Sequence, residues 1–505
     1  MNKKSPNLLT PDFVKKSLSA HLLLGLIASG LLYVVSVSGT LAVLYPDLER
    51  WEQPNIQEFT DYEPAVLDQA VRTLLGKIAE EKNSTIQADH MHVVPPTQSF
   101  PRVSVSADLG DGEDIEWYAN QSGDLQEPVA HDWTHFLLNL HIYLNLPGVF
   151  GLTLVGLLGV MMGSLIITGF LAHPRIFRDA FRLKWSGSSQ IREADLHNRL
   201  SVWGSPFHII FAVTGAYFGL ASLLLYATTA LLYDGDQKAL TNPLFVDYEI
   251  ENKTPAEIGS LGAVWNTLTA ASPDAIPYFV NFDHPGTEGQ MFSIYAKFND
   301  RLIYGERFDF NGQGSLIGTQ GLSDGPVGKQ IFASVYPLHF GSFGGLPVRL
   351  TYVLLGLALC VVCAGGMKIW LIKKRQKGQA VPLVERLWTA TVWGTPALLA
   401  LTALLSLWTS LPLVALFWGG AILLLIGSMV WGDAEKWRTG LLYACFLLLL
   451  ATLASHLVLF GADAFGPAAL TVNSLIIISF ICLGLMLVKK TRFRQMENVS
   501  SVGQG

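Results

Sequence analysis

Histidines at the starts of long apolar segments are the residues of this chain whose type and spacing indicate a chemical function. His21 precedes a Ser-Gly pair that ends at Gly39, and His197 precedes a Thr-Gly pair that ends at Gly215; both offsets are 18 residues. Ionisable side chains are costly inside a membrane, so a histidine there is a candidate functional group. Two such histidines on different helices could ligate one haem iron between them.

A second pair of histidines shares another layout. His141 is followed by a Leu-Pro pair that ends at Pro147, and His339 by one that ends at Pro347; a glycine stands ten residues beyond each of these leucines. Internal repeats of this kind decide architecture, because each repeat is a structural unit. The pattern predicts a tandem duplication, in which each half contributes two helices and two histidines to a four-helix haem-binding core.

The composition is that of a membrane protein. Half of the 505 residues are hydrophobic and 15% are charged, whereas soluble proteins have about 25% charged residues. Several apolar runs reach the length of about 20 residues that a membrane helix needs. The net charge of −6 argues against nucleic acid as a partner, which favours a basic patch. All four cysteines fall inside apolar runs, so we expect no disulfide framework and no iron–sulfur cluster.

The chain alternates between membrane and outside segments. We predict a polytopic α-helical membrane protein with two periplasmic α+β domains and four additional C-terminal transmembrane helices. The predicted divisions are 1–45 (N-terminus and first span), 46–134 (first periplasmic domain), 135–233 (second span, cytoplasmic loop and third span), 234–338 (second periplasmic domain), 339–376 (fourth span) and 377–505 (four-helix extension). In both periplasmic segments, helical periodicity over 64–80 or 255–271 precedes short β-like runs.

Basic residues set the orientation. Lysines at Lys3 and Lys4 precede the first span, Arg and Lys are frequent between 174 and 199, and Lys373-Lys374-Arg375 closes the fourth span. By the positive-inside rule these segments are cytoplasmic, and eight spans place both termini there. The C-terminal extension could pack as a lipid-facing buttress or contact a partner.

This topology sorts the repeated histidines into two pairs. His21 and His197 lie at the cytoplasmic entrance, and His141 and His339 lie at the outer entrance. In a haem site one ring nitrogen binds iron while the other usually donates a hydrogen bond. The sequence therefore predicts two haems, one per membrane side, that could conduct electrons across the bilayer.

Two other histidines compete for these roles. His208 could replace His197 as a ligand or bond a neighbouring helix, and the second interpretation is favoured. His135 could replace His141, or could bind a metal ion together with His131, since the two are spaced i, i+4. A polar helix face is the favoured interpretation of that spacing.

Two further histidines are not candidates for the haem ligands in either pair. His173 begins the basic cytoplasmic loop and could neutralise haem propionates together with Arg175 or Arg199. His456 lies within the seventh span without an obvious partner.

Four stretches resemble the PepSY-associated transmembrane helix family, often described as iron-regulated membrane proteins. They run from Ala20-His21 to Gly39, from Leu140-His141 to Thr168-Gly169, from Asp195-Leu196-His197 to Thr214-Gly215, and from Leu338-His339 to Lys374-Arg375. The resemblance covers about residues 12–376. Ala20 stands where the family usually has leucine, and Leu23 where an aromatic residue is common.

The resemblance implies a function, because characterised relatives include di-haem ferric-siderophore reductases of the bacterial inner membrane. It implies reduction of a ferric siderophore, or another periplasmic ferric chelate, to release Fe(II). Iron(II) binds hard oxygen ligands more weakly than iron(III) does. The electron donor would be a quinol or a cytoplasmic reductase.

Two hypotheses of other classes stand beside this one. The first is a PepSY-type regulatory or binding membrane protein without redox activity, which would purify colourless. The second is a siderophore or iron transporter, although the core spans hold few acidic residues of the kind that such pathways use.

Overall fold

The chain folds into two compact units. The computed structural model describes residues 10–82, 89–109, 114–181, 188–242, 252–299, 301–321 and 325–502. The membrane unit comprises Met1–Trp51, Asp132–Leu223 and Leu346–Gly505, and the sheet unit comprises Glu52–His131 and Leu224–Gly345. Lys3 and Lys4, which contributed to the predicted orientation, lie outside the described residues.

The membrane unit is helical. Among the described residues, eight helices are long and apolar enough to cross a membrane. They are α1 (Pro11–Ala42), α5 (Gly148–Ala172), α7 (Ser189–Leu232), α11 (Gly345–Gln376), α12 (Pro382–Ser406), α13 (Leu413–Val430), α14 (Ala434–Phe460) and α15 (Pro467–Val502). Shorter helices connect them: α2 (Tyr45–Glu52), α4 (Asp132–Tyr143), α6 (Ile176–Asp179) and the 3-10 helix η1 (Asp463–Phe465).

Helix α1 begins ten residues before the predicted span, for a local reason. The side chain of Thr10 accepts a hydrogen bond from the Phe13 backbone N–H at 3.3 Å, and Pro11 occupies the first turn. An N-terminal hydroxyl cap and an early proline both favour a helix start. The helix therefore extends through the polar stretch before His21, so this histidine lies within a helix.

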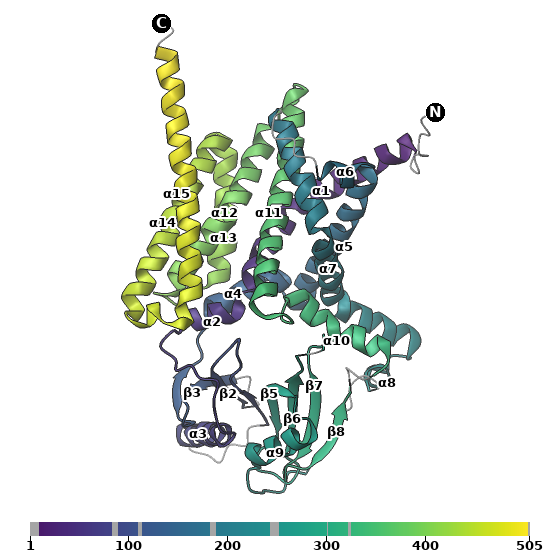
Figure 1. Ribbon diagram of the computed structural model, residues 1–505, viewed down its shortest axis with the longest axis vertical. Coiled ribbons are helices and arrows are strands. Elements are labelled where there is room, and N and C mark those ends of the chain that lie inside the picture. Colours follow the sequence, from purple (N-terminus) through teal and green to yellow (C-terminus); the bar gives the residue numbers. More distant parts are fainter. Residues whose placement is uncertain are drawn as a thin grey trace. The chain divides into compact units, whose positions relative to one another are not determined.

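The C-terminal helices pack against the repeat-derived helices, as a buttress would. Figure 1 shows α12, α13, α14 and α15 gathered on one side of the membrane unit. The Tyr33 hydroxyl of α1 donates to the Val392 carbonyl of α12 at 2.9 Å. The Trp133 indole of α4 donates to the Thr402 hydroxyl of α12 at 3.1 Å. Because these buried polar groups are satisfied across the contact, the extension has one defined position on α1 and α4.

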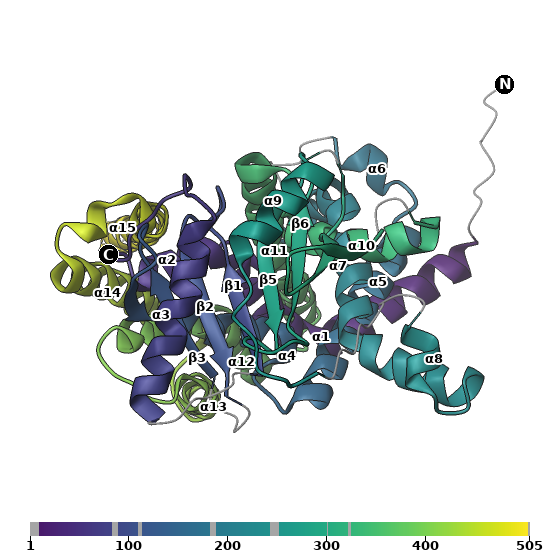
Figure 2. The same cartoon turned by 90° about the horizontal axis from the view of Figure 1, so that it is seen from below.

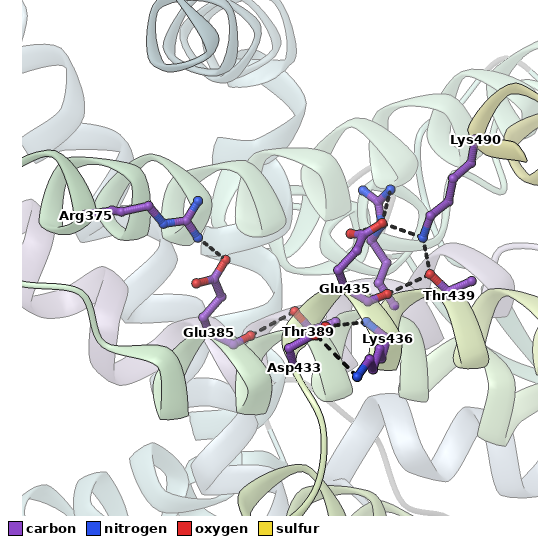
Figure 3. A network of polar contacts seen from close by, with 9 residues as sticks. Arg375, Glu385, Thr389, Asp433, Glu435, Lys436, Thr439 and Lys490 are labelled. Atoms are coloured by element: carbon purple, nitrogen blue, oxygen red, sulfur yellow. Dashed lines mark hydrogen bonds and ion pairs between the residues drawn. The ribbon is translucent and has the colours of Figure 1, made fainter. Parts of the chain in front are cut away.

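Charged residues connect neighbouring helices at the ends of these spans. Figure 3 shows Arg375 of α11 pointing to Glu385 of α12, with an N–O distance of 2.5 Å. It also shows Lys490 of α15 bonded to both Glu435 and Thr439 of α14. Long basic side chains of this kind favour the membrane–water interface.

The two segments that were predicted as periplasmic α+β domains contribute strands to one sheet. Its strands are β1 (His90–Val94), β2 (Val103–Asp108), β3 (Asp114–Ala119), β4 (Leu125–Pro128), β5 (Ile276–Asp283), β6 (Met291–Lys297), β7 (Glu306–Asn311) and β8 (Leu316–Gln320). They form one antiparallel sheet in the order β4-β3-β2-β1-β5-β6-β7-β8. Pairing β1 with β5 removes an unpaired edge from each half, which explains the single sheet.

The helices of the sheet unit are α3 (Ala65–Lys82), α8 (Gln237–Thr241), α9 (Leu261–Ala271) and α10 (Val327–Phe340). Helices α3 and α9 cover one face of the sheet, in front of the strands in Figure 2. Leu67 and Leu74 of α3 and Val264 of α9 share a buried core with Val105 and Phe292 of the sheet. Helix α9 begins six residues after the predicted start at Pro255, which instead forms an isolated bridge with Thr287.

The opposite face of the sheet contains a polar row. Ser293 of β6 lies between its partners Asn281 of β5 and Asp309 of β7. Asp309 accepts from the Ser293 hydroxyl at 2.7 Å and from Arg307 Nε at 2.6 Å. Burial raises the pKa of Asp309, and these two bonds only partly oppose the increase.

Candidate functional site

His21 of α1 and His197 of α7, the predicted inner pair, lie next to each other. Their ring centroids are 6.4 Å apart and their planes are nearly perpendicular, at 85°. They come from helices that are far apart in the sequence, and each ring is partly buried. The structure therefore brings together the two histidines that the repeat pairs.

Each ring is held by a backbone carbonyl of a third or fourth helix. His21 Nδ1 donates to the Leu165 carbonyl of α5 at 3.0 Å, and His197 Nδ1 donates to the Val362 carbonyl of α11 at 3.0 Å. A bond of this kind fixes the tautomer, because Nδ1 must carry the hydrogen. Nε2 of each ring is then the nitrogen with an available lone pair.

Glycines make room for both rings. A Cβ atom on Gly169 would lie 3.3 Å from His21 Cε1, and one on Gly366 would lie 3.2 Å from His197 Cε1. Each glycine follows the carbonyl that holds the ring by one helical turn, since Leu165 precedes Gly169 by four residues and Val362 precedes Gly366 by four.

His141 of α4 follows the same arrangement on α1. Its Nδ1 donates to the Val35 carbonyl at 3.0 Å. A Cβ atom on Gly39, four residues further along α1, would lie 2.5 Å from His141 Cε1 and 2.7 Å from Nδ1. Three of the four repeated histidines therefore share one mode of support: a carbonyl that accepts from Nδ1, and a glycine one turn later under the ring.

The sequence identified the histidines but missed the groups that hold them. The repeated offset between histidine and glycine was visible, and Gly39 and Gly169 close two of the family-like stretches. Which histidine each glycine supports was not visible, because His141 rests on the glycine that follows His21. Backbone carbonyls left no sequence signal of their own.

His339 lies in the sheet unit, in the last turn of α10. Its ring contacts that of Phe340, with centroids 5.5 Å apart. The helix ends at Gly341 in the left-handed conformation, with φ of 66°, as glycine allows at a helix C-terminus. Because His141 belongs to the membrane unit, the pairing of His141 with His339 stays a prediction.

The histidines that were considered as alternative haem ligands lie outside the inner pair. His208 is buried in α7, and its Nε2 bonds the Leu355 carbonyl of α11 at 3.3 Å. His135 is exposed on α4, whereas His131 precedes that helix and belongs to the sheet unit. In the part of the chain that the structure describes, no group of three or more His, Cys, Asp or Glu side chains is placed to hold a metal ion.

His173 and Arg199 line a cavity of about 180 Å³ beside α6. His173 ends α5, with an exposed side chain. Arg199 is buried and engages both carboxylate oxygens of Asp195, at 2.7 and 3.3 Å, while also donating to the Ala180 carbonyl at 2.8 Å. Arg199 thus serves a structural ion pair, which argues against the predicted propionate role for this residue.

His456, which had no partner in the sequence interpretation, lies in a buried network. Its Nε2 donates to the Trp51 carbonyl at 2.8 Å, and its ring stacks on Trp51 with centroids 4.6 Å apart. Asn473 of α15 bonds His456 Nδ1 at 3.3 Å and accepts from the Trp51 indole at 2.9 Å. Both ring nitrogens are bonded, so His456 connects α14 to α2 and α15.

The fold and the site define a polytopic membrane protein whose first and third spans face each other through histidines. The model of the family described as "PepSY-associated TM region" matches residues 18–373, and the chain belongs to that family. It is also similar to an uncharacterized protein of Pseudomonas aeruginosa, with 28% identity over 347 residues, which is 64% of this chain and 86% of that protein.

Proposed function

We propose that this protein transfers electrons across the membrane through two b-type haems and reduces a periplasmic ferric chelate, such as a ferric siderophore. The observation that carries the proposal is the separation of the inner histidine rings. An imidazole nitrogen lies about 1.1 Å from its ring centre, and a metal–nitrogen bond is about 2.0–2.1 Å long. Two imidazoles on opposite sides of one metal therefore have centroids about 6.3 Å apart, close to the 6.4 Å between His21 and His197.

The surroundings of the rings fit a haem ligand pair. Carbonyl bonds at Nδ1 direct Nε2 of His21 and His197 to the ligand position, which is the usual outer-shell arrangement of metal-bound histidine. Gly169 and Gly366 allow both rings to lie close to the neighbouring helices. A haem, when bound, would supply one-electron chemistry between iron(III) and iron(II).

The chain's own residues would then hold and orient the group. His21 and His197 would be the residues that hold the haem, and the carbonyls of Leu165 and Val362 keep each ring in one orientation. The buried apolar helix surfaces exclude water, and this favours a ligand pair without net charge. His141 is the matching residue for the second haem, with His339 as its predicted partner.

The first experiment is an absorption spectrum of the purified protein, oxidised and dithionite-reduced, with haem quantified against protein. We expect about two b-type haems per chain, since the repeat offers two histidine pairs. His197→Ala should leave about one haem, because an axial ligand cannot be replaced by a methyl group. His284→Ala, a histidine of the sheet unit, is the matched control and should keep both.

Two outcomes would overturn parts of the proposal. A colourless protein from cells well supplied with haem would end the electron-transfer proposal and favour the regulatory alternative. Full haem content in His197→Ala would show that this ligand assignment is wrong. Haem binding without reduction of any ferric chelate would leave the electron acceptor open.

A further inference from the structure

The cavity beside α6 is lined by residues that neighbour the inner histidine pair in the sequence. Its wall includes Asn198 and Arg199, which directly follow His197 in α7. On the other side it includes His173, which stands one turn beyond Gly169, the glycine under the His21 ring. A helix with its side chains is about 10–12 Å wide, so the cavity lies within about one helix diameter of the inner pair.

The wall of the cavity carries polar groups. His173, Asp179 and Asn198 supply an imidazole, a carboxylate and an amide, three groups that can bond the hydroxyls of a small ring. Large aromatic side chains are exposed close by in sequence: Phe177 (59% exposed), Phe181 (75%) and Trp203 (54%). Exposed aromatic residues at the end of a span are typical of the membrane interface.

The charged side chains that line the cavity do not favour binding of a reductant that carries phosphate groups. Nicotinamide and flavin nucleotides bring phosphates that need free cationic or backbone donors. Arg199 already engages both oxygens of Asp195, and Asp179 adds a further carboxylate to the wall. A neutral ring with hydroxyl groups and an apolar tail fits both the polar wall and the exposed aromatic border.

We infer that this cavity binds the head group of a membrane quinol, which donates electrons to the inner site. The inference rests on the proposed function. Oxidation breaks both O–H bonds of the quinol and gives a quinone, two protons and two electrons. One proton passes to the His173 imidazole and the other to water beside Asp179. The two electrons would pass one at a time to the group that His21 and His197 would hold, so one quinol would supply the electrons for reducing two ferric chelates to Fe(II).

The test measures binding of a quinol-like ring to the cavity separately from electron transfer to the haem. The quinol analogue 2-heptyl-4-hydroxyquinoline N-oxide, whose own fluorescence is quenched on binding, is titrated into the full-length protein. Menadiol is then used as the reductant, and the haem bands are followed. In the double variant His173→Ala/Asn198→Ala we expect at least tenfold weaker analogue binding and at least tenfold slower reduction by menadiol. The dithionite-reduced spectrum should stay unchanged, and His284→Ala should behave as the wild type.

Each outcome decides between the two proposals. Wild-type protein that contains haem and is reduced by dithionite, but neither binds the analogue nor accepts electrons from menadiol, overturns the quinol site alone. Unchanged binding and reduction in the double variant overturns it as well. Protein without haem overturns the proposed function, and the quinol site with it.

Discussion

At the scale of single residues, the histidines are supported by glycines that leave little room for a larger side chain. Gly39 is the strictest case, because an added Cβ would lie 2.5 Å from Cε1 of His141, and the ring cannot retreat without losing its bond to Val35. We expect Gly39→Ala to displace His141 and to lower haem content from about two per chain to about one. Haem quantification by absorption measures this.

Gly30 provides the control on the same helix. A Cβ atom there would meet nothing within 4 Å. Alanine has a higher helix propensity than glycine by about 1 kcal/mol, so Gly30→Ala should keep the haem and leave stability equal or slightly higher. Loss of haem in both variants would mean that the effect of Gly39→Ala has another cause.

Asn473 is the central residue of the His456 network. Asn473→Ala removes the acceptor of the Trp51 indole and the partner of His456 Nδ1. Each buried polar group left without a partner costs about 1–3 kcal/mol, so the apparent melting temperature should fall clearly. Thermal unfolding in detergent measures this, and Asn55→Ala, at an exposed asparagine with one bond to Glu127, should change little.

The residues of the inner pair were predictable from the sequence, and their environment was not. His21 and His197 were visible because the repeat places them at equivalent positions. For His208 the favoured expectation, a bond to a neighbouring helix, agrees with its bond to the Leu355 carbonyl of α11. The carbonyls that His208 and His456 bond could not be named from the sequence, because each is more than 100 residues away in the chain. A lone buried histidine looks the same in sequence whether its partner is a metal or a carbonyl.

At the scale of secondary-structure elements, α3 and α9 are connected by one carboxylate. Asp68 of α3 accepts from the backbone N–H groups of Leu261 at 2.6 Å and Gly262 at 3.1 Å, and from the Ser260 hydroxyl at 2.8 Å. It thereby satisfies the free donors at the start of α9, where a negative charge is favourable.

Removing this carboxylate should loosen α9. Losing a helix N-terminal partner typically costs about 0.5–2 kcal/mol, so Asp68→Ala should increase amide hydrogen exchange in the first turn of α9. Hydrogen-exchange mass spectrometry on the full chain checks this. Asp274→Ala, at an exposed turn after α9, is the control; equal exchange in both variants would contradict the role of Asp68.

The element boundaries show what sequence patterns can and cannot locate. Apolar runs placed all eight long helices, since membrane length sets a clear threshold. Helix α4 was not predicted as a separate helix, because its 12 residues are too few to span the membrane. The pairing of β1 with β5 was also missed, since it joins strands almost 190 residues apart in the chain.

At the scale of the whole molecule, the C-terminal extension supports α4 more directly than the inner pair. Phe136 of α4 contacts Phe417 of α13, with ring centroids 5.8 Å apart, and the Trp418 indole donates to the Leu144 carbonyl at 2.9 Å. Both contacts flank the segment that carries His141.

A chain that ends at residue 376 should therefore lose its two predicted haems unequally. We expect the haem at His141 to dissociate first, because α4 loses contacts on both sides of His141. The haem between His21 and His197 should be kept longer, because the contact of α1 with the extension lies at Tyr33, about three helical turns from His21. Redox titration that resolves the two haems measures the loss. Equal loss of both would show that the extension stabilises the membrane unit as a whole.

The single sheet has a consequence for how such a chain could arise. Each half supplies four strands in sequence order outward from the centre, and the first strands, β1 and β5, pair antiparallel in the middle. An ancestor with one half would have exposed that central edge, and a second copy of itself would have supplied the missing strand. Gene fusion would then have made the partnership permanent. It would also have freed the two copies to diverge, as at His208 and Leu32, which stand at the same offset after His197 and His21.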